Sequence, residues 1–112
     1  MFADLYDAVS LIFSSRWPRV DGVITAVDVE RISHGKNADS WRLAVAYQFC
    51  IGEDGPYTGE SFWNPRYCSK RRVIVARRKM HMRQPVTIRY RKDDPSVNRL
   101  DRAVWSRLKA SG

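Results

Sequence analysis

The segment WRLAVAYQFCI, residues 41–51, decides the fold. Apolar or aromatic side chains occupy every second position from Trp41 to Ile51, and small or polar ones such as Arg42 and Gln48 alternate with them. A period of two is the pattern of a β-strand with one face toward the core. The segment therefore predicts a half-covered strand of an antiparallel sheet.

The same alternation predicts further strands on both sides of this segment. In residues 20–32 it runs through Val23, Thr25, Val27 and Val29, with acidic residues pointing the other way. The remaining strands are expected at 57–63 (YTGESFW) and at the start of 85–95 (PVTIRYRKDDP). A polar loop at 33–40 (SHGKNADS) is expected between the first two strands, a turn at 52–56 before the third, and a turn at 93–95 after the last.

Apolar residues at helical spacing predict a helix near each end of the chain. Residues 2–14 carry one apolar face, and the helix is expected to end at Trp17-Pro18, because the residue before a proline avoids the α region. Residues 98–109 form the last expected helix, with basic residues around its apolar side.

The stretch SKRRVIVARRKMHMRQ, residues 69–84, holds seven Lys/Arg and no acidic residue, and two conformations compete for it. Ser69 as an N-cap, basic residues toward the far end and Pro85 as a stop favour a helix over 69–82. The Val-Ile-Val run at 73–75 favours a strand, as do the cations at the helix start, where each is disfavoured by about 0.3–1 kcal/mol. We expect the helix.

Together these elements predict an α+β domain. It has a small antiparallel sheet of about three to five strands, sandwich- or barrel-like, with short helices at the N-terminus, around 69–82 and at the C-terminus. We expect a single domain over 1–112, with its core in 16–97 and amphipathic end helices at 1–15 and 98–109. No apolar run approaches the roughly 20 residues of a membrane span, and the acidic N-terminal stretch does not read as a signal peptide.

Charge is distributed unevenly along the chain. Residues 1–60 hold five Lys/Arg and nine Asp/Glu, a net of −4, whereas residues 61–112 hold fifteen and three, a net of +12; the two sum to the total of +8. Eleven basic residues and no acidic one lie between Glu60 and Asp93. Such asymmetry suggests an anionic partner, either nucleic acid or a lipid surface. A solvated face whose excess charge only keeps the protein soluble carries about equal weight as an interpretation.

The first functional hypothesis is a non-catalytic interaction module. It would act at the cytoplasmic membrane surface, peripheral to the inner membrane, or bind a protein partner in a small complex. The alternative is sequence-nonspecific binding of nucleic acid through the basic 66–92 face, beside aromatic residues between Tyr57 and Tyr67. The residues expected to contact the anion are Arg66, Lys70, Arg71, Arg72, Arg77, Arg78, Lys79 and Arg83.

The residues do not predict a catalytic or metal centre. Cys50 and Cys68 are 17 residues apart without a CxxC motif, and two histidines do not complete a zinc pattern, so we expect no metal and no cofactor. A distant third hypothesis is a small enzyme that uses His81 or a Cys68 thiol activated by Lys70. A small buried thiol is the favoured interpretation.

Several short motifs occur in a fixed order along the chain: Trp17-Pro18, Gly22-Val23, the alternation through Tyr47, Tyr57-Thr58-Gly59 and PVTIRYRKDDPSVNRL at 85–100. Their order and spacing over residues 16–100 resemble the bacterial domain-of-unknown-function family 3592. Members usually carry Tyr-x-Pro where this chain has Tyr90 to Pro95, and often a Gly where Gln84-Pro85 stands. The resemblance implies the fold and frequent membrane association, and no established activity.

Overall fold

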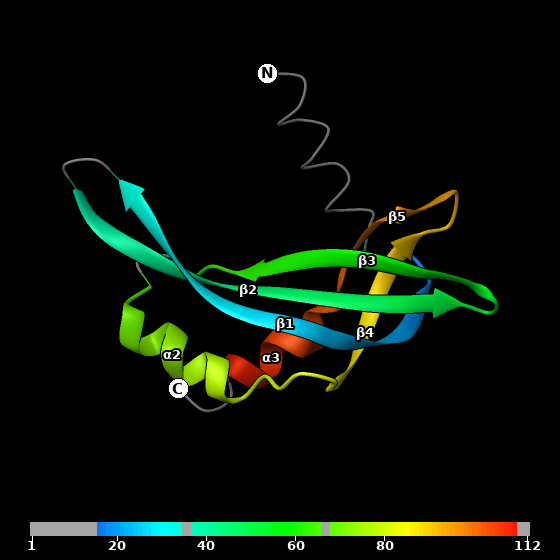
Figure 1. Cartoon of the computed structure of the whole chain (residues 1–112). Coiled ribbons are helices and arrows are strands. Elements are labelled where there is room, and N and C mark those ends of the chain that lie inside the picture. The colour runs from blue at the N-terminus through cyan, green and yellow to red at the C-terminus, as the bar shows by residue number, and fades with distance from the viewer. Residues whose placement is uncertain (1–15, 35–36, 66–67, 110–112) are drawn as a thin grey trace, which may run out of the picture.

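The computed structural model describes residues 16–34, 37–65 and 68–109 (Figure 1). Within them, five strands form one antiparallel sheet in the order β3-β2-β1-β4-β5, accompanied by two short helices. This arrangement confirms the expected α+β class, whereas the expected helix at 2–14 lies outside the described residues. The elements are β1 (Arg19–His34), β2 (Asn37–Ile51), β3 (Asp54–Trp63), α2 (Lys70–Arg78), β4 (Pro85–Arg91), β5 (Asp94–Leu100) and α3 (Arg102–Lys109).

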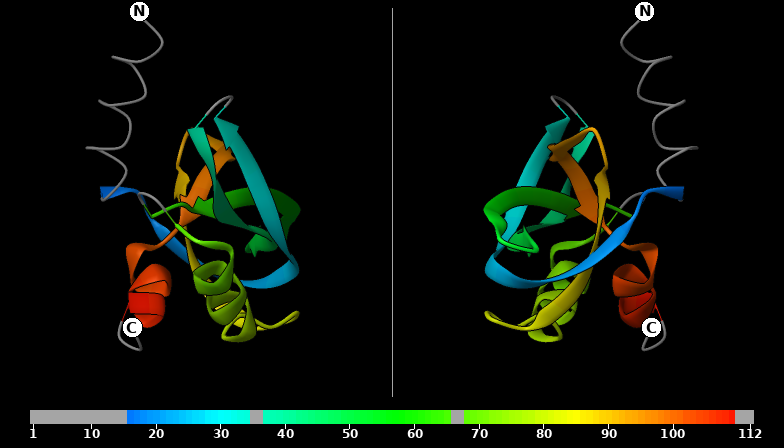
Figure 2. Two further views of the ribbon diagram at one scale, coloured as in Figure 1. Left: turned by 90° about the vertical axis from the view of Figure 1, so that its left-hand side faces the viewer. Right: turned by 90° about the vertical axis from the view of Figure 1, so that its right-hand side faces the viewer.

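The strand order is that of a Greek key. β1, β2 and β3 follow one another through hairpins, and the connection that contains α2 returns the chain to place β4 beside β1. β1 is long enough to serve both halves of the sheet: its residues 19–23 pair with β4, and its residues 22–34 pair with β2. The sheet curls strongly as a result, and α2 and α3 lie side by side below it (Figure 2).

Side chains join the two edge strands of the curled sheet. The hydroxyl of Tyr47, on β2, donates a hydrogen bond of 2.6 Å to Asn98 Oδ1 on β5. Asn98 Nδ2 donates to the carbonyl of Thr58 on β3 at 3.3 Å, and the Leu100 N–H donates to Ser61 Oγ at 3.1 Å. These bonds hold β5 against β3, although the two strands are at opposite edges of the sheet and are not paired as neighbours.

A β-bulge changes the expected face of β1. The pairing with β2 reaches Ile24 opposite Tyr47, and the next pair skips Thr25, which is therefore one extra residue. The side chain of Ile24 is completely buried, and the inward positions switch from even to odd numbers beyond the bulge. The prediction that Val23 and Thr25 share a face with Val29 is thus wrong, because an inserted residue reverses the alternation.

The core lies between the inner face of the sheet and the two helices. The alternation in 41–51 is confirmed, and so is the one in 85–91. The fully or nearly buried residues include Leu43, Val45, Tyr47 and Phe49 of β2, Val86 and Ile88 of β4, Val73 and Ala76 of α2, Met80 just after it, and Val104 and Leu108 of α3.

Two predicted boundaries in this sheet are corrected. Residues 33–34 and 37–40, which were expected in a loop, belong to strands: β1 and β2 continue as a two-stranded ribbon up to the pair His34–Asn37, because backbone hydrogen bonds do not require apolar side chains. Similarly, the turn predicted at 93–95 is shorter and lies between Arg91 and Asp94, which pair with each other.

The C-terminal helix is also shorter than expected. Residues 98–100 belong to β5, and α3 starts only at Arg102. Asp101 explains the start, because its Oδ1 accepts the Ala103 N–H at 2.9 Å as an N-cap. Since Val104 and Leu108 are buried in the core, the apolar side of α3 packs on the sheet. Among the described residues no helix is long and apolar enough to cross a bilayer.

Candidate functional site

Helix α2 forms in the most basic part of the chain. Ser69 is its N-cap: the residue is extended, and its Oγ accepts the Arg72 N–H at 3.2 Å. The helix interpretation is therefore confirmed, although α2 ends at Arg78 and residues 79–82 leave the helix. The cations at its start lie over aromatic rings, which offset their unfavourable position: Lys70 Nζ is 5.1 Å from the centre of the Trp41 ring.

The structure divides the predicted anion-binding residues into two groups. Lys70 and Arg72 lie over rings, Arg72 at 5.5 Å from the centre of Trp63, and Arg77 Nε donates to the Val27 carbonyl at 3.3 Å. Lys79 is half-buried at the C-cap. The exposed residues whose contacts with the protein are fewest are Arg71, Arg78 and Arg83, and Arg66 lies outside the described residues.

The charge of this stretch is not offset by carboxylates. The part of the chain that the structure describes contains four ion pairs. Two of them join β1 to β2, and the other two join an arginine of β4 to an aspartate that follows β4 or β5. None includes a residue of 69–83. The positive charge on α2 is therefore available to an external anion.

The outer surface of α2 also carries apolar side chains. Ile74 and Val75 lie between Arg71 and Arg78, because residues three and four apart share one side of a helix. The Val75 side chain is 43% exposed. We call Lys70, Arg71, Ile74, Val75 and Arg78, which line one shallow depression, the α2 face.

The turn after α2 projects a methionine into solvent. Met82 is 68% exposed, and the turn around it is fixed by hydrogen bonds from the His81 N–H to Gln84 Oε1 at 2.8 Å and from the Gln84 N–H to the His81 carbonyl at 3.1 Å. Arg83 takes the left-handed conformation, with φ 65°, and its N–H donates to the Ile24 carbonyl at 2.7 Å. The fold itself thus holds Met82 outward.

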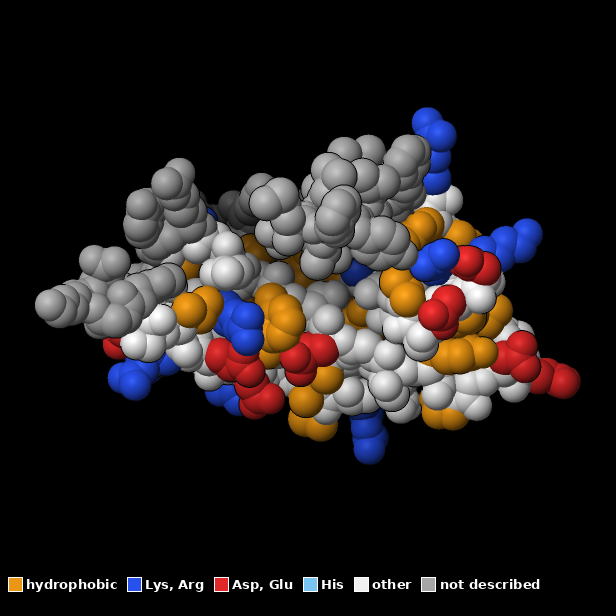
Figure 3. Space-filling model, turned by 90° about the horizontal axis from the view of Figure 1, so that it is seen from above, with side chains coloured by type: hydrophobic (Ala, Val, Ile, Leu, Met, Phe, Trp, Pro, Cys, Tyr) orange, Lys and Arg blue, Asp and Glu red, His pale blue; other side chains and the backbone are white. Residues whose placement is uncertain are grey.

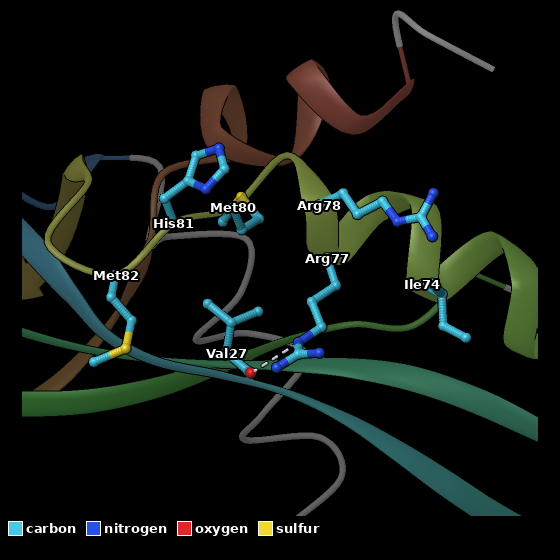
Figure 4. A pocket seen from close by; sticks show the side chains of 7 residues that line it. All are labelled: Val27, Ile74, Arg77, Arg78, Met80, His81 and Met82. Atoms are coloured by element: carbon cyan, nitrogen blue, oxygen red, sulfur yellow. Dashed lines mark hydrogen bonds between the residues drawn. The ribbon is translucent and has the colours of Figure 1, made fainter.

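A groove of about 550 Å³ lies between α2, this turn and β1 (Figure 4). Apolar side chains from all three elements form its floor, and cationic or imidazole side chains stand at its rim. We call it the α2–β1 groove, and it is lined by Val27, Ile74, Arg77, Arg78, Met80, His81 and Met82. It continues into the α2 face through Ile74 and Arg78, which line both.

The outer surface of strands β2 and β3 has a different character. The register places Asp28 beside Ala44 and Glu60 beside Ala46, and Glu30 accepts a hydrogen bond of 2.8 Å from Arg42. The side of the molecule away from α2 shows acidic side chains among hydrophobic ones, with Lys and Arg side chains beside them (Figure 3). The described cations of 69–83 therefore stand on a separate surface.

The two candidate catalytic residues lie apart. Cys68 precedes α2 and His81 follows it, and a nine-residue helix spans roughly 13 Å. Cys68 is 1% exposed, and burial raises the pKa of its thiol against the smaller lowering effect of the Arg72 charge. The interpretation as a buried thiol is confirmed, and both cysteines are free, with Cys50 exposed.

Sequence reasoning found the cations of this site and missed its apolar part. Successive helical residues are about 100° apart, so Val73, Ile74 and Val75 span roughly 200° and cannot all face the core. This run, used above only as an argument for a strand, was the available signal. The exposure of Met82 depends on the turn geometry and had no signal of its own.

Comparison of the chain with protein-family models, with curated proteins and with solved structures finds no match. The resemblance to family 3592 stays a prediction. Any assignment of function therefore rests on the α2 face and the α2–β1 groove.

Proposed function

We propose that the protein is a non-catalytic module that attaches peripherally to an anionic lipid surface, at the cytoplasmic side of a membrane. One observation carries the proposal: on the outside of α2, the exposed Val75 and the half-buried Ile74 lie between Arg71 and Arg78. Binding of nucleic acid phosphates requires only the cations, and a solvated face requires neither apolar residue. A basic surface with apolar side chains among its cations suits the headgroup layer, where charge meets phosphate and side chains reach the acyl boundary.

The expected affinity is that of a reversible contact. Each cation near an anionic leaflet contributes about 1 kcal/mol, so Lys70, Arg71 and Arg78 supply about 3 kcal/mol. Burying the exposed parts of Val75 and Met82, at about 0.8 kcal/mol per CH₂, adds about 3 kcal/mol. The total of about 6 kcal/mol corresponds to a Kd of roughly 40 µM. A second contact between the protein and the same lipid layer would tighten this binding.

Vesicle co-sedimentation tests the proposal with matched valines. The protein should pellet with phosphatidylserine-containing vesicles at physiological salt and not with pure phosphatidylcholine vesicles. Val75→Ser should weaken binding about five- to tenfold, the loss expected for about one to two buried CH₂ groups. Val97→Ser, on β5 and 36% exposed, should leave binding unchanged. Equal effects of the two substitutions, or no pelleting of the wild type, would refute the proposal.

A matched substitution of arginines tests the contribution of charge. The double variant Arg71→Gln, Arg78→Gln should lose about 2 kcal/mol of binding, or roughly thirtyfold in Kd. Arg31→Gln, whose side chain is 62% exposed on β1, serves as the control for loss of a surface cation. Binding that falls equally in both variants would show that net charge matters and the α2 face does not.

Sequence-nonspecific nucleic-acid binding remains the second candidate because of the strand arrangement. A five-stranded, partly open Greek-key barrel is the architecture of the OB-fold, which binds oligonucleotides on its β2–β3 face. In this chain that face pairs Ala46 with Glu60 and the buried Ala44 with the exposed Phe62, and Phe62 is covered by Arg42, 3.9 Å from the ring centre. Duplex DNA as a competitor distinguishes the two candidates. Nucleic acid would be favoured if DNA displaces the protein from vesicles and if the logarithm of the association constant for DNA falls with the logarithm of the salt concentration by about 0.9 for each neutralised phosphate.

A further inference from the structure

The α2–β1 groove has the features of a site for one small ligand, beyond a surface that meets a lipid layer. We infer that it binds a single anionic, phosphate-bearing amphiphile, with the alkyl chain along Val27 and Met82 and the phosphate at Arg77 and Arg78. This inference rests on the proposed function, because the ligand would come from the same layer that the α2 face contacts.

The floor of the groove suits an alkyl chain. Val27 of β1 and Met82 of the turn lie on one side of the Arg77 side chain and Ile74 of α2 on the other, and the buried Met80 lines the groove near the end of α2 (Figure 4). The volume of about 550 Å³ lies within the range of roughly 300–1,000 Å³ typical of ligand sites. Methionine side chains are unbranched and polarizable, so they adapt to a flexible chain.

The rim suits a phosphate. Arg77 Nε donates to the Val27 carbonyl, which fixes the guanidinium at the edge of the floor. A guanidinium has five N–H donors, and within the described residues Arg77 uses this one, so the others remain for an anion. Arg78 and His81 stand at the same rim, and the residues that line the groove in the described part of the chain include no carboxylate. A phosphate is the anion whose geometry two guanidinium groups match best.

The groove needs little rearrangement to bind. The turn that carries Met82 is held by the His81–Gln84 hydrogen bonds and by the Arg83 N–H on Ile24. A site that is already formed loses less free energy to ordering when its ligand enters. Since Ile74 and Arg78 belong both to the groove and to the α2 face, a lipid in contact with the face lies at the groove mouth.

Titration with dodecyl phosphate below its critical micelle concentration tests the inference, read by calorimetry and by ¹H–¹⁵N NMR shifts. We expect saturable binding of one molecule per chain, with shifts centred on Val27 and Met82. Dodecylphosphocholine has the same chain and a zwitterionic head, in which choline offsets the single charge of the phosphate diester, and it should bind at least tenfold more weakly. Inorganic phosphate, which is the head without the chain, should also bind at least tenfold more weakly than dodecyl phosphate. This comparison distinguishes a lipid headgroup from free phosphate as the ligand.

Variants separate this inference from the proposed function. Met82→Ser and Arg78→Gln change exposed side chains of the groove, and each should weaken dodecyl phosphate binding at least tenfold. Val75→Ser, on the α2 face and outside the groove, should keep that binding while it weakens vesicle pelleting. Vesicle pelleting without saturable dodecyl phosphate binding overturns the inference and leaves the proposed function standing; loss of both in the wild type overturns both.

Discussion

Two Arg–Asp ion pairs that involve β4 allow a sharp test of how burial sets the strength of an ion pair. Arg89 Nε to Asp101 Oδ2 and Arg91 Nε to Asp93 Oδ1 are both 2.7 Å apart. The side chains of the first pair are 15% and 13% exposed, and those of the second are 39% and 66% exposed. Replacing either aspartate by asparagine keeps the size of the side chain and removes its charge, so the two variants differ mainly in burial.

Asp101→Asn should cost about 2–3 kcal/mol of unfolding free energy. Removing one partner of a fully buried pair costs about 3–5 kcal/mol, and the remaining exposure of this pair reduces that figure. The cap on α3 is retained, because asparagine caps a helix as well as aspartate does. Asp93→Asn removes an exposed pair and should cost about 0–1 kcal/mol.

Urea unfolding followed by far-UV circular dichroism measures both variants. With a slope of about 1–3 kcal/mol per molar, the midpoint of Asp101→Asn should fall by roughly 1–2 M, with an unchanged slope. The midpoint of Asp93→Asn should stay close to that of the wild type. Equal shifts in the two variants would refute the reasoning, since geometry alone would then set the strength of these pairs.

Three other outcomes follow from the same contacts. Burial alone raises the pKa of Asp101, but its hydrogen bonds and neighbouring arginine charges lower it more. The stability that Asp101 contributes is therefore fully present above the unfolded-state pKa of about 4 and is lost as the pH falls through the lowered folded-state pKa. The urea midpoints of wild type and Asp101→Asn should accordingly converge as the pH falls below about 4. Gly59→Ala should lower the unfolding free energy by about 1–3 kcal/mol, because the new Cβ meets Asn98 Oδ1 at the β3–β5 seam, and an unchanged urea midpoint would contradict that packing. A thiol-specific chromogenic reagent should label Cys50 quickly in the native protein and the buried Cys68 only in denaturant; two fast thiols in the native protein would contradict the burial of Cys68.

The fold was predictable where the alternation of apolar and polar side chains matches the alternation of buried and exposed positions. The alternation in 41–51 identified β2 and its buried face, because that strand lies inside the sheet with partners on both edges. The extra residue at Thr25 was not predictable, since a single insertion alters no composition and leaves apolar residues on both sides. The ribbon at the ends of β1 and β2 was missed for a related reason: its pairing depends on backbone groups, which polar side chains do not reveal.

The candidate site was predictable in composition and not in arrangement. The positive charge of 69–83 was evident from the sequence, as was the N-cap at Ser69. Which cations are held by the protein depends on Trp41 of β2 and Trp63 at the end of β3, which the fold brings beneath Lys70 and Arg72. Contacts of that kind arise from the tertiary fold, and local pattern does not contain them.

Several local features of α2 and its turn are unfavourable for the protein in water. Three cations occupy the helix N-terminus with no acidic residue in the first turn, Val75 and Met82 are exposed, and Arg83 takes a left-handed backbone. Trp41 and Trp63 offset part of the first cost, at Lys70 and Arg72. The proposed anionic layer with an apolar interior would offset the rest of it and the second cost. The third belongs to the turn that holds Met82 outward. Proteins tend to keep such local conflicts where a ligand compensates for them. Their concentration in α2 and the turn that follows it is therefore an argument for binding at this part of the molecule that does not depend on net charge.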